Sequence, residues 1–349
     1  MTQIDVSTAP AGEPYPEIER AYLEYRKACY YTLYRHARHR ELLAALRRPA
    51  TVREVGMEMG FLPERDDVLE LLLEALVRFG ALLHDESGRY RLNPYFSDDA
   101  LDLDRDLLAA AAGRDRVEAL LHGQSYAGIV DALYASDNRV ASDFSGRNRD
   151  LWNEFLQLPF YIQARQAAVG LVASPGATVC DLACGPGFGL LELAEKVGEE
   201  GAVVGVEVSP DFVSDSIERA AGLPNAYVAY ANLEHGVPFL RDDYFDGITM
   251  VGALHFIRDR DRLLDDVARI LAPGGTFCAA YTLTTTDSYD AELMRLRFSL
   301  REPASYPIDP DELVAAAERH GLRHSTKGFR MGCFITFVFD KASEEAPAR

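Results

Sequence analysis

The sequence predicts an α/β protein in which a mainly helical domain precedes a doubly wound sheet of seven strands. Two observations lead to this prediction. From about residue 151, short apolar segments typical of buried strands alternate with helical patterns, an order that builds a parallel sheet with helices on both faces. Before residue 150, helical patterns dominate. The length of 349 residues exceeds that of one average domain, so two domains are expected.

The first domain is expected to contain three helices and a hairpin. Pro49 stops the first helix, because proline cannot continue the helical hydrogen-bond ladder. Thr51 can cap the second helix, and Gly60 can end it. Gly80 ends the third helix, and the hairpin turns at a Ser-Gly pair. The predicted ranges are 17–48, 51–57 and 64–78 for the helices and 81–93 for the hairpin.

Helix, short helix, helix, hairpin is the winged-helix arrangement, which raises the question of DNA binding. The third helix would lie in the groove, yet it carries five acidic residues and two arginines. A helix that faces phosphates should be basic, and the net charge of −19 repels nucleic acid and anionic membranes. We therefore expect neither nucleic acid nor a membrane as a partner. The remaining interpretation is a packing or dimerisation module.

Clustered tyrosines in the first helix favour a protein interface or the roof of a pocket over free solvent. They are Tyr22, Tyr25, Tyr30, Tyr31 and Tyr34.

Composition favours a cytoplasmic protein without a metal centre. No apolar run reaches the ~18 residues of a membrane span, and the N-terminus lacks the pattern of a secretory signal. None of the five cysteines forms a CxxC pair, which suggests reduced, buried thiols. Cys180 and Cys184 can be interpreted as metal ligands or as small core residues. The core interpretation is favoured because no histidine or further cysteine completes a zinc spacing.

The second domain is expected to supply the sheet and the ligand site. In doubly wound sheets, ligands bind at the carboxyl ends of the strands near the switch point. The predicted strands are 177–183, 202–208, 226–232, 245–254, 276–284, 324–329 and 333–341, and the helices between them are 190–198, 209–222, 259–275 and 309–321. Segment 101–150 is expected to be a helical linker and pocket roof, and residues 1–16 and 341–349 are expected to be flexible.

A glycine-rich loop, DLACGPGFG, follows the first predicted strand over residues 181–189. Glycine permits a sharp turn into the next helix and a close approach of the backbone to a ligand. No GxGxxG fits this register and no P-loop lysine follows, so the phosphate-free ligand S-adenosylmethionine becomes the alternative. Glu207 ends the second strand, where a carboxylate would bind ribose hydroxyls. A nicotinamide cofactor would use an acid there too, so Glu207 alone does not discriminate.

Four motifs in order resemble the class I S-adenosylmethionine-dependent methyltransferases, which have a Rossmann-like fold. The glycine loop, VCDLACGPGFG, resembles the first motif of that family, with Ala183 in place of its usual first glycine. VVGVEVS resembles the second motif, and ILAPGGTF resembles the turn before strand five. Between them, residues 230–259 resemble the stretch that holds the adenine-contacting residue and strand four.

The resemblance implies a role for each motif residue in holding S-adenosylmethionine. Gly185 and Gly187 let the backbone approach the methionine moiety, and Asp181 contacts its amino group. Glu207 binds the ribose. Tyr161, in the helix before the first strand, is a candidate for the methionine carboxylate, with ordinary helix packing as the alternative.

Two further motifs imply the remaining cofactor contacts. Asn232 hydrogen-bonds the adenine amine, and Leu233 packs on the adenine ring. Val251 and Gly252, which end the fourth strand, line the sulfonium side.

The first domain resembles the winged-helix dimerisation domain of small-molecule O-methyltransferases, on the segments 49–61 and 69–94. That resemblance implies a homodimer, with the domain helping to roof the acceptor site. Residues 98–150 carry no motif of this subgroup.

His255 is the candidate general base. The subgroup carries H-D-W-x-D after strand four, and residues 255–259 here are HFIRD, so the first and last positions match. Imidazole titrates near neutrality and can take a proton as the methyl group moves in an in-line displacement. Phe256 and Ile257 differ from the two middle residues of that motif, so C- and N-methylation stay open beside O-methylation.

The long connection from Thr284 to Pro307 is expected to be a lid or a packed amphipathic insertion. Its candidates for acceptor contacts are Tyr289, Arg295, Arg297 and Tyr306; the arginines would suit an acid or a diphosphate.

The function predicted from these motifs is methyl transfer from S-adenosylmethionine to a small-molecule acceptor of the secondary-metabolite type. Two alternatives remain open. One is an enzyme of the same fold that uses the cofactor for a non-methylating reaction such as cyclisation. The other is a winged-helix regulator that senses a ligand.

Overall fold

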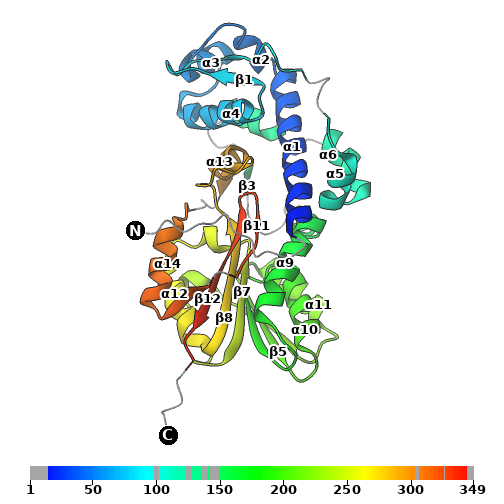
Figure 1. Ribbon diagram of the computed structural model, residues 1–349, viewed down its shortest axis with the longest axis vertical. Coiled ribbons are helices and arrows are strands. Elements are labelled where there is room, and N and C mark those ends of the chain that lie inside the picture. The colour runs from blue at the N-terminus through cyan, green and yellow to red at the C-terminus, as the bar shows by residue number, and fades with distance from the viewer. Residues whose placement is uncertain are drawn as a thin grey trace.

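The computed structural model describes residues 15–97, 102–122, 127–134, 140–141, 149–302, 306–325 and 327–343. A helical module lies at one end and an α/β domain at the other, and the long first helix runs between them (Figure 1). The arm predicted at 1–16 and the tail predicted at 341–349 fall almost entirely outside the described residues.

The helical module begins as the sequence predicts, with one correction. Its elements are α1 (Tyr15–His39), α2 (Leu42–Ala45), α3 (Val52–Met59), α4 (Asp66–Arg78), β1 (Leu82–His84) and β2 (Tyr90–Leu92), and β1 pairs with β2 as an antiparallel hairpin. The single helix expected over 17–48 is wrong, because Glu41 adopts a left-handed conformation with φ of 62° and separates α1 from α2. Thr51 and Glu54 form a capping box at α3, and Gly60 ends that helix.

Three of the five tyrosines of α1 are core residues, whereas Tyr25 and Tyr31 are only partly buried. Tyr22 and Tyr30 are fully buried, and Tyr34 is 8% exposed. The Tyr22 ring packs edge-on against Phe160 of the α/β domain. The rings are thus wholly or partly covered within the chain, and their part in a protein interface or in the roof of a pocket stays a prediction.

Short helices connect the module to the sheet. They are α5 (Arg105–Ala112), α6 (Val117–His122), α7 (Ala127–Asp131), α8 (Arg149–Phe155) and α9 (Pro159–Val172). The two-residue strand β3 (Val140–Ala141) pairs in parallel with β9 (Arg301–Glu302).

The main sheet confirms the predicted α/β fold. Its strands are β4 (Thr178–Leu182), β5 (Ala202–Glu207), β6 (Ala226–Tyr230), β7 (Phe245–Val251), β8 (Leu271–Thr282), β10 (Leu322–Ser325) and β12 (Phe334–Lys341), with β11 (Arg330–Met331) paired to β12. The order is β10-β12-β8-β7-β4-β5-β6, in which β12 is antiparallel to both its neighbours and the other pairs are parallel. The strand expected over 324–329 starts earlier, at Leu322.

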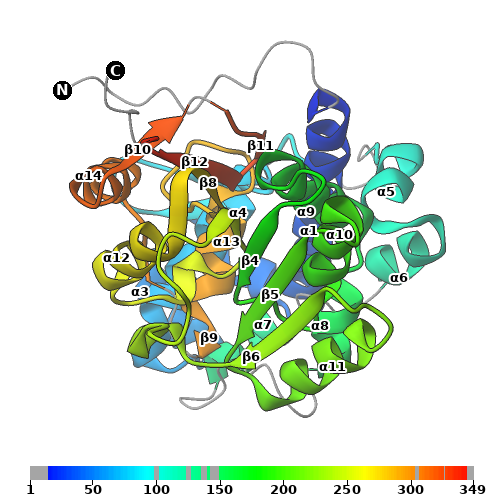
Figure 2. The same cartoon turned by 90° about the horizontal axis from the view of Figure 1, so that it is seen from below.

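Helices cover both faces of this sheet (Figure 2). On one face lie α9, α10 (Phe188–Val197) and α11 (Pro210–Ala220), and on the other lie α12 (Arg260–Ile270) and α14 (Pro310–Arg319). The chain moves from β4 to the neighbouring β5 and β6 and then returns to β7 on the other side of β4. The carboxyl ends of β4 and β7 therefore form the switch point at which such sheets bind ligands.

All five cysteines are free and buried, as predicted. Among the described residues, no helix is long and apolar enough to cross a membrane.

Candidate active site

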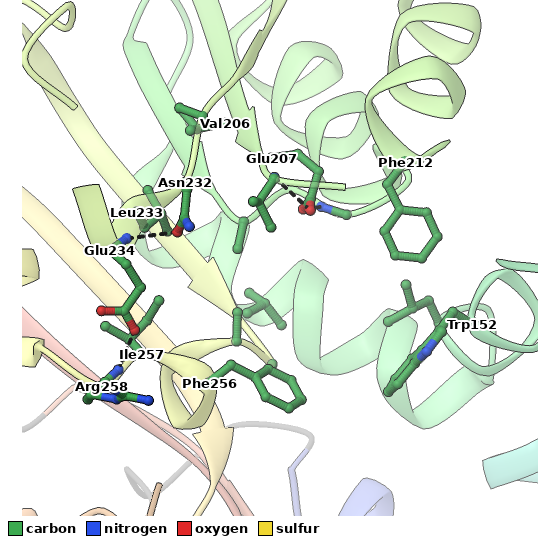
Figure 3. A pocket seen from close by; sticks show the side chains of 18 of the residues that line it. Trp152, Val206, Glu207, Phe212, Asn232, Leu233, Glu234, Phe256, Ile257 and Arg258 are labelled. Atoms are coloured by element: carbon green, nitrogen blue, oxygen red, sulfur yellow. Dashed lines mark hydrogen bonds between the residues drawn. The ribbon is translucent and has the colours of Figure 1, made fainter. Parts of the chain in front are cut away.

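A cavity of about 560 Å³ opens at the carboxyl ends of β4, β5, β6 and β7 (Figure 3). Its size is typical of a small-molecule site. The lining residues are Trp152, Leu156, Tyr161, Ala183, Gly185, Val206, Glu207, Val208, Phe212, Ala231, Asn232, Leu233, Glu234, Val251, Gly252, Ala253, Phe256, Ile257, Arg258 and Tyr306. Eight of the predicted cofactor residues are among them. Asp181 lines an adjoining cavity, and Gly187 lines neither of the two.

The glycine loop is shaped by left-handed backbone and by close packing against α11. Ala183, Gly185 and Gly187 all have positive φ, of 57°, 57° and 89°. A Cβ at Gly187 would lie 2.9 Å from the Ser216 Cα, so a side chain there would collide with the backbone of α11. The Ser216 hydroxyl donates to the Gly185 carbonyl at 2.7 Å. The loop is thus held in one conformation with its backbone against the cavity.

Glu207 presents a fixed carboxylate to the cavity. Its Oε2 accepts from the backbone N–H of Gly185 at 2.9 Å, and its Oε1 accepts from those of Val208 and Ser209 at 2.8 Å each. Burial raises the pKa of Glu207, whereas these N–H groups act to lower it. Oε2 accepts only one of these bonds and keeps further acceptor capacity, so a ligand hydroxyl can donate to it.

Asp181 lies at the other end of the glycine loop, in a small cavity of about 50 Å³. Tyr161, Ala183 and Gly185 line both cavities, which therefore lie side by side and share part of one wall. The Thr249 hydroxyl donates to Asp181 at 2.8 Å. Burial raises the pKa of Asp181 to about 7, against the opposing effects of Thr249 and Arg165.

The ends of β6 and β7 complete the cavity. The Asn232 side-chain oxygen accepts from the Glu234 N–H at 3.0 Å, which orients the amide, and Leu233 lies beside it in the wall. Gly252 has φ of 77°, and a Cβ there would lie 2.0 Å from the Tyr161 hydroxyl. Only glycine therefore lets Tyr161 pack directly over the end of β7.

His255, the predicted base, is not in the cavity wall. It lies in the 3₁₀ helix Leu254–Phe256 and is 5% exposed. Its ring contacts Phe256 at a centroid distance of 4.1 Å and stacks on Phe298 at 4.9 Å. This geometry is that of a packing residue behind the wall, so the general-base role stays a prediction that the arrangement does not favour.

The connection 284–307 is a packed insertion for most of its described length. It forms α13 (Ala291–Ser299), and Arg78 of α4 donates to Glu292 at 2.9 and 3.3 Å. Of its four predicted acceptor residues, Tyr306 lines the cavity. The other three contact neighbours within the chain. Tyr289 packs against Tyr30, Arg295 Nε donates to the Thr284 carbonyl at 2.8 Å, and the Arg297 guanidinium lies over the Phe155 ring.

Several residues of the site were missed by sequence reasoning. Arg165 lines the smaller cavity, and its position one turn after Tyr161 in α9 is a helical spacing that would have indicated it. Trp152 and Phe212 line the larger cavity from α8 and α11. No local signal marks these rings, because their placement depends on how helices distant in sequence pack together.

The fold is Rossmann-like, and the acid at the end of β5, the glycine loop and Asn232 line one cavity at the carboxyl ends of its strands. The sequence has no P-loop lysine after the glycine loop. Comparison with known proteins gives the family. Residues 173–306 match a family model described as a methyltransferase domain. This part of the chain is a class I S-adenosylmethionine-dependent methyltransferase domain, and its methyl donor is S-adenosylmethionine.

Curated relatives share this domain. A demethylmenaquinone methyltransferase of Desulfitobacterium hafniense is 31% identical over 43% of this chain and 59% of its own length. A 2-phytyl-1,4-naphtoquinone methyltransferase of Trichormus variabilis is 33% identical over 36% of this chain and 55% of its own length. The chain thus spans little more than half of either relative.

A solved structure, a SAM-dependent methyltransferase from Aquifex aeolicus, is 21% identical, with a TM-score of 0.44 over 56% of this chain and 98% of that one. The winged-helix assignment of the helical module stays a prediction.

Proposed function

We propose that this protein transfers the methyl group of S-adenosylmethionine to a small-molecule acceptor. The observation that carries the proposal is Glu207, whose carboxylate is held by three backbone N–H groups at the wall of a cavity that also contains Asn232 and the end of β7. Bound S-adenosylmethionine supplies a methyl group on a positively charged sulfur. Glu207 binds the ribose hydroxyls, and Asn232 and Leu233 hold the adenine.

The remaining residues of the site orient the other end of the cofactor. Asp181 binds the ammonium group from the small cavity, and Val251 and Gly252 face the sulfonium side. Positioning of the two reactants provides much of the acceleration in such a displacement. The proposal does not require His255 to act as the base, because that ring is buried behind Phe256.

We further propose an acceptor of the secondary-metabolite type, methylated at oxygen or carbon, and a homodimeric, cytoplasmic protein. The quinone names of two relatives support a ring-containing acceptor. The dimer rests on the resemblance of the helical module to a dimerisation domain. Light scattering coupled to gel filtration tests the dimer, and a monomeric mass at micromolar concentration would exclude it.

Calorimetric titration with S-adenosylhomocysteine tests the cofactor site. We expect micromolar binding to the full chain and no binding of NAD. Glu207→Ala should weaken binding by roughly 10- to 100-fold, since hydrogen bonds to a charged group are each worth about 1.5–3 kcal/mol. Glu200→Ala, an exposed glutamate beyond α10, is the matched control and should bind like the parent chain.

A second variant separates lost contacts from lost folding. Glu207→Gln keeps the size of the side chain and removes its charge, so it should fold normally and still bind weakly. Unchanged affinity in both Glu207 variants would refute the placement of the ribose. Formation of S-adenosylhomocysteine with an acceptor then distinguishes methyl transfer from a non-methylating reaction.

A further inference from the structure

The two edge strands of the main sheet differ in charge. β10 forms one edge and β6 the other (Figure 2). β10 carries the exposed Arg323, and the exposed Lys327 follows it. β6 lies within residues 220–233, a stretch without Asp, Glu, Lys or Arg. Charged side chains on an edge strand discourage pairing with another chain, so β10 has this protection and β6 does not.

Two exposed tyrosines lie on β6. Tyr227 is 57% exposed and Tyr230 is 64% exposed, although both belong to one strand of five residues. Their side chains face opposite sides of the sheet, because side chains alternate along a strand. Both sides of this edge therefore present an aromatic ring and no charge, and interfaces between proteins are enriched in aromatic residues and depleted of charged ones at their centres.

The hydrogen bonds to β5 determine which main-chain groups of β6 face outward. The Val203 N–H donates to the Asn225 carbonyl at 2.8 Å, and the Ala231 N–H donates to the Glu207 carbonyl at 2.9 Å. Odd-numbered residues of β6 thus direct their main-chain groups to β5, and even-numbered residues direct theirs away from it. The outward groups belong to Ala226, Val228 and Tyr230. None of these groups has a hydrogen-bond partner among the described residues.

A second copy of β6 can satisfy these outward groups by antiparallel pairing. The register that pairs all five residues has its two-fold axis at Val228, so that residue pairs with itself. Ala226 then lies opposite Tyr230 of the other copy, and these pairs exchange their N–H and C=O groups. Tyr227 lies opposite Ala229, so each tyrosine meets a small side chain.

The net charge of the chain favours this strand as the meeting point of two copies. Two copies that each carry a charge of −19 repel each other. That repulsion is weakened locally where the approaching strands and the turns beside them are uncharged, as over residues 220–233.

We propose that β6 is an interaction surface for a second copy of this chain, whose β6 pairs with it antiparallel and joins the two sheets into one. The surface differs from the helical module to which the dimer is assigned above. The lining residues of the cofactor cavity do not include 226–230, so this pairing does not depend on the proposed function.

Sedimentation equilibrium of the full chain over a range of concentrations tests the association. Small interfaces are weak, so we expect a dissociation constant of roughly 10–100 μM. This constant should fall as salt is added, because salt screens the repulsion between like charges. Tyr230→Lys should raise it at least about tenfold. Tyr95→Lys is the matched control: it makes the same change at a tyrosine that is 92% exposed beyond β2, and should leave the constant unchanged.

A proline variant tests the main-chain pairing itself. Val228→Pro removes an N–H group that faces outward and keeps those that bond to β5, and edge strands tolerate proline at such positions. It should raise the dissociation constant by roughly 5- to 100-fold, since each dimer loses two hydrogen bonds. Circular dichroism and the urea midpoint establish that each variant is folded before its association is measured.

Disulfide crosslinking tests the register. Val228→Cys puts the two new cysteines opposite each other, with Cα atoms about 5.5 Å apart, which a disulfide can span. Ala226→Cys is the control, because its two copies lie four residues apart along the paired strands, at roughly 13 Å or more, which no disulfide can span. The native cysteines are all buried. Mild oxidation should therefore crosslink Val228→Cys and not Ala226→Cys.

Three results would overturn the β6 surface. The first is a mass that does not change with concentration, since no second copy then binds at the edge. The second is association that survives both Tyr230→Lys and Val228→Pro, or that Tyr95→Lys removes, since other surfaces would then hold the copies together. The third is a dissociation constant that rises with salt, or a crosslink in Ala226→Cys without one in Val228→Cys. Binding of S-adenosylhomocysteine is measured separately, so a failure of the cofactor site is distinguishable from each of these.

Discussion

Ala183 shows at the scale of one residue why this family usually has glycine at the head of the loop. Its φ of 57° is left-handed, a conformation that costs an L-residue about 1–2 kcal/mol. The chain tolerates the strain because the neighbouring turns hold the loop, with Gly185 and Gly187 also at positive φ. The alanine is thus a local departure from the motif that leaves the loop geometry in place.

Ala183→Gly should therefore stabilise the protein. The relief of strain exceeds the extra entropy of glycine in the unfolded chain, which is about 0.4–1 kcal/mol, so we expect a gain of about 0.5–1 kcal/mol in the free energy of unfolding. Urea denaturation measures it. Ala173→Gly is the control and should lower the free energy of unfolding, because Ala173 has φ of −113° and no strain to relieve. A loss of stability in Ala183→Gly would contradict the strain argument.

Asp181 makes cofactor binding sensitive to pH. Burial raises the pKa of this carboxyl to about 7, and only its ionised form attracts an ammonium group. The carboxylate is mostly ionised at pH 8 and mostly protonated at pH 6, so binding of S-adenosylhomocysteine should weaken about tenfold over that interval. Titration at a series of pH values tests this. Asp181→Asn should bind weakly with a flat profile, and a flat profile in the parent chain would exclude this role.

At the scale of elements, the sequence predicts those that are set by local pattern. The parallel strands and the cap of α3 follow from apolar runs and from Thr51 with Gly60, which act within a few residues. The break between α1 and α2 falls at Glu41, where no glycine or proline in the sequence indicates it. The burial of Tyr22 and the packing of α13 on α4 arise from contacts between distant segments, which periodicity does not encode.

The residues of the site also divide into those that local sequence pattern predicts and those that depend on contacts between distant segments. The motif residues Glu207 and Asn232 lie in the cavity wall, because their positions follow from the ends of predicted strands. The aromatic wall was not predicted, since Trp152 and Phe212 come from helices that meet only in the folded chain. His255 matched a motif position, yet the turn after β7 directs its ring toward Phe298 and not into the cavity.

The hydrogen bonds that Arg149 and Asn153 of α8 donate to Asp215 of α11 should hold the aromatic wall, formed by Trp152 and Phe212, in place. Asp215→Ala removes the acceptor for Arg149 and Asn153, so α8 should become more mobile and Trp152 more exposed. Because Trp152 is the only tryptophan in the sequence, its emission should shift to longer wavelength and its quenching by acrylamide should rise. Glu218→Ala, at an exposed position of α11, is the control. Unchanged emission in Asp215→Ala would show that other contacts hold α8.

For the whole molecule, one apolar core crosses the boundary that the sequence suggested near residue 150. A single cluster of buried residues runs from Ala21 in α1 through Leu72 in α4 and Phe160 in α9 to Phe334 in β12. The domain limits predicted at 100 and 150 remain predictions; this cluster includes residues on both sides of them, and two further clusters pack on the faces of the sheet. The helical module and the sheet are therefore expected to unfold together.

Asp290 provides the test of that coupling. It is fully buried between the two parts and accepts from the Tyr22 hydroxyl at 2.7 Å, the Ser288 hydroxyl at 2.7 Å and the Cys333 N–H at 3.0 Å. Arg26 Nε lies 3.7 Å away. Asp290→Asn removes the negative charge beside a buried guanidinium and should cost about 3 kcal/mol in the free energy of unfolding.

The measurement is urea denaturation followed by far-ultraviolet circular dichroism and by Trp152 fluorescence. If the core is one cooperative unit, both signals should shift to the same lower urea concentration, although Trp152 is distant in sequence from Asp290. Asp287→Asn, an exposed aspartate in the same connection, is the control and should leave both midpoints in place. A shift in the dichroism alone would mean that the helical module unfolds separately from the methyltransferase domain.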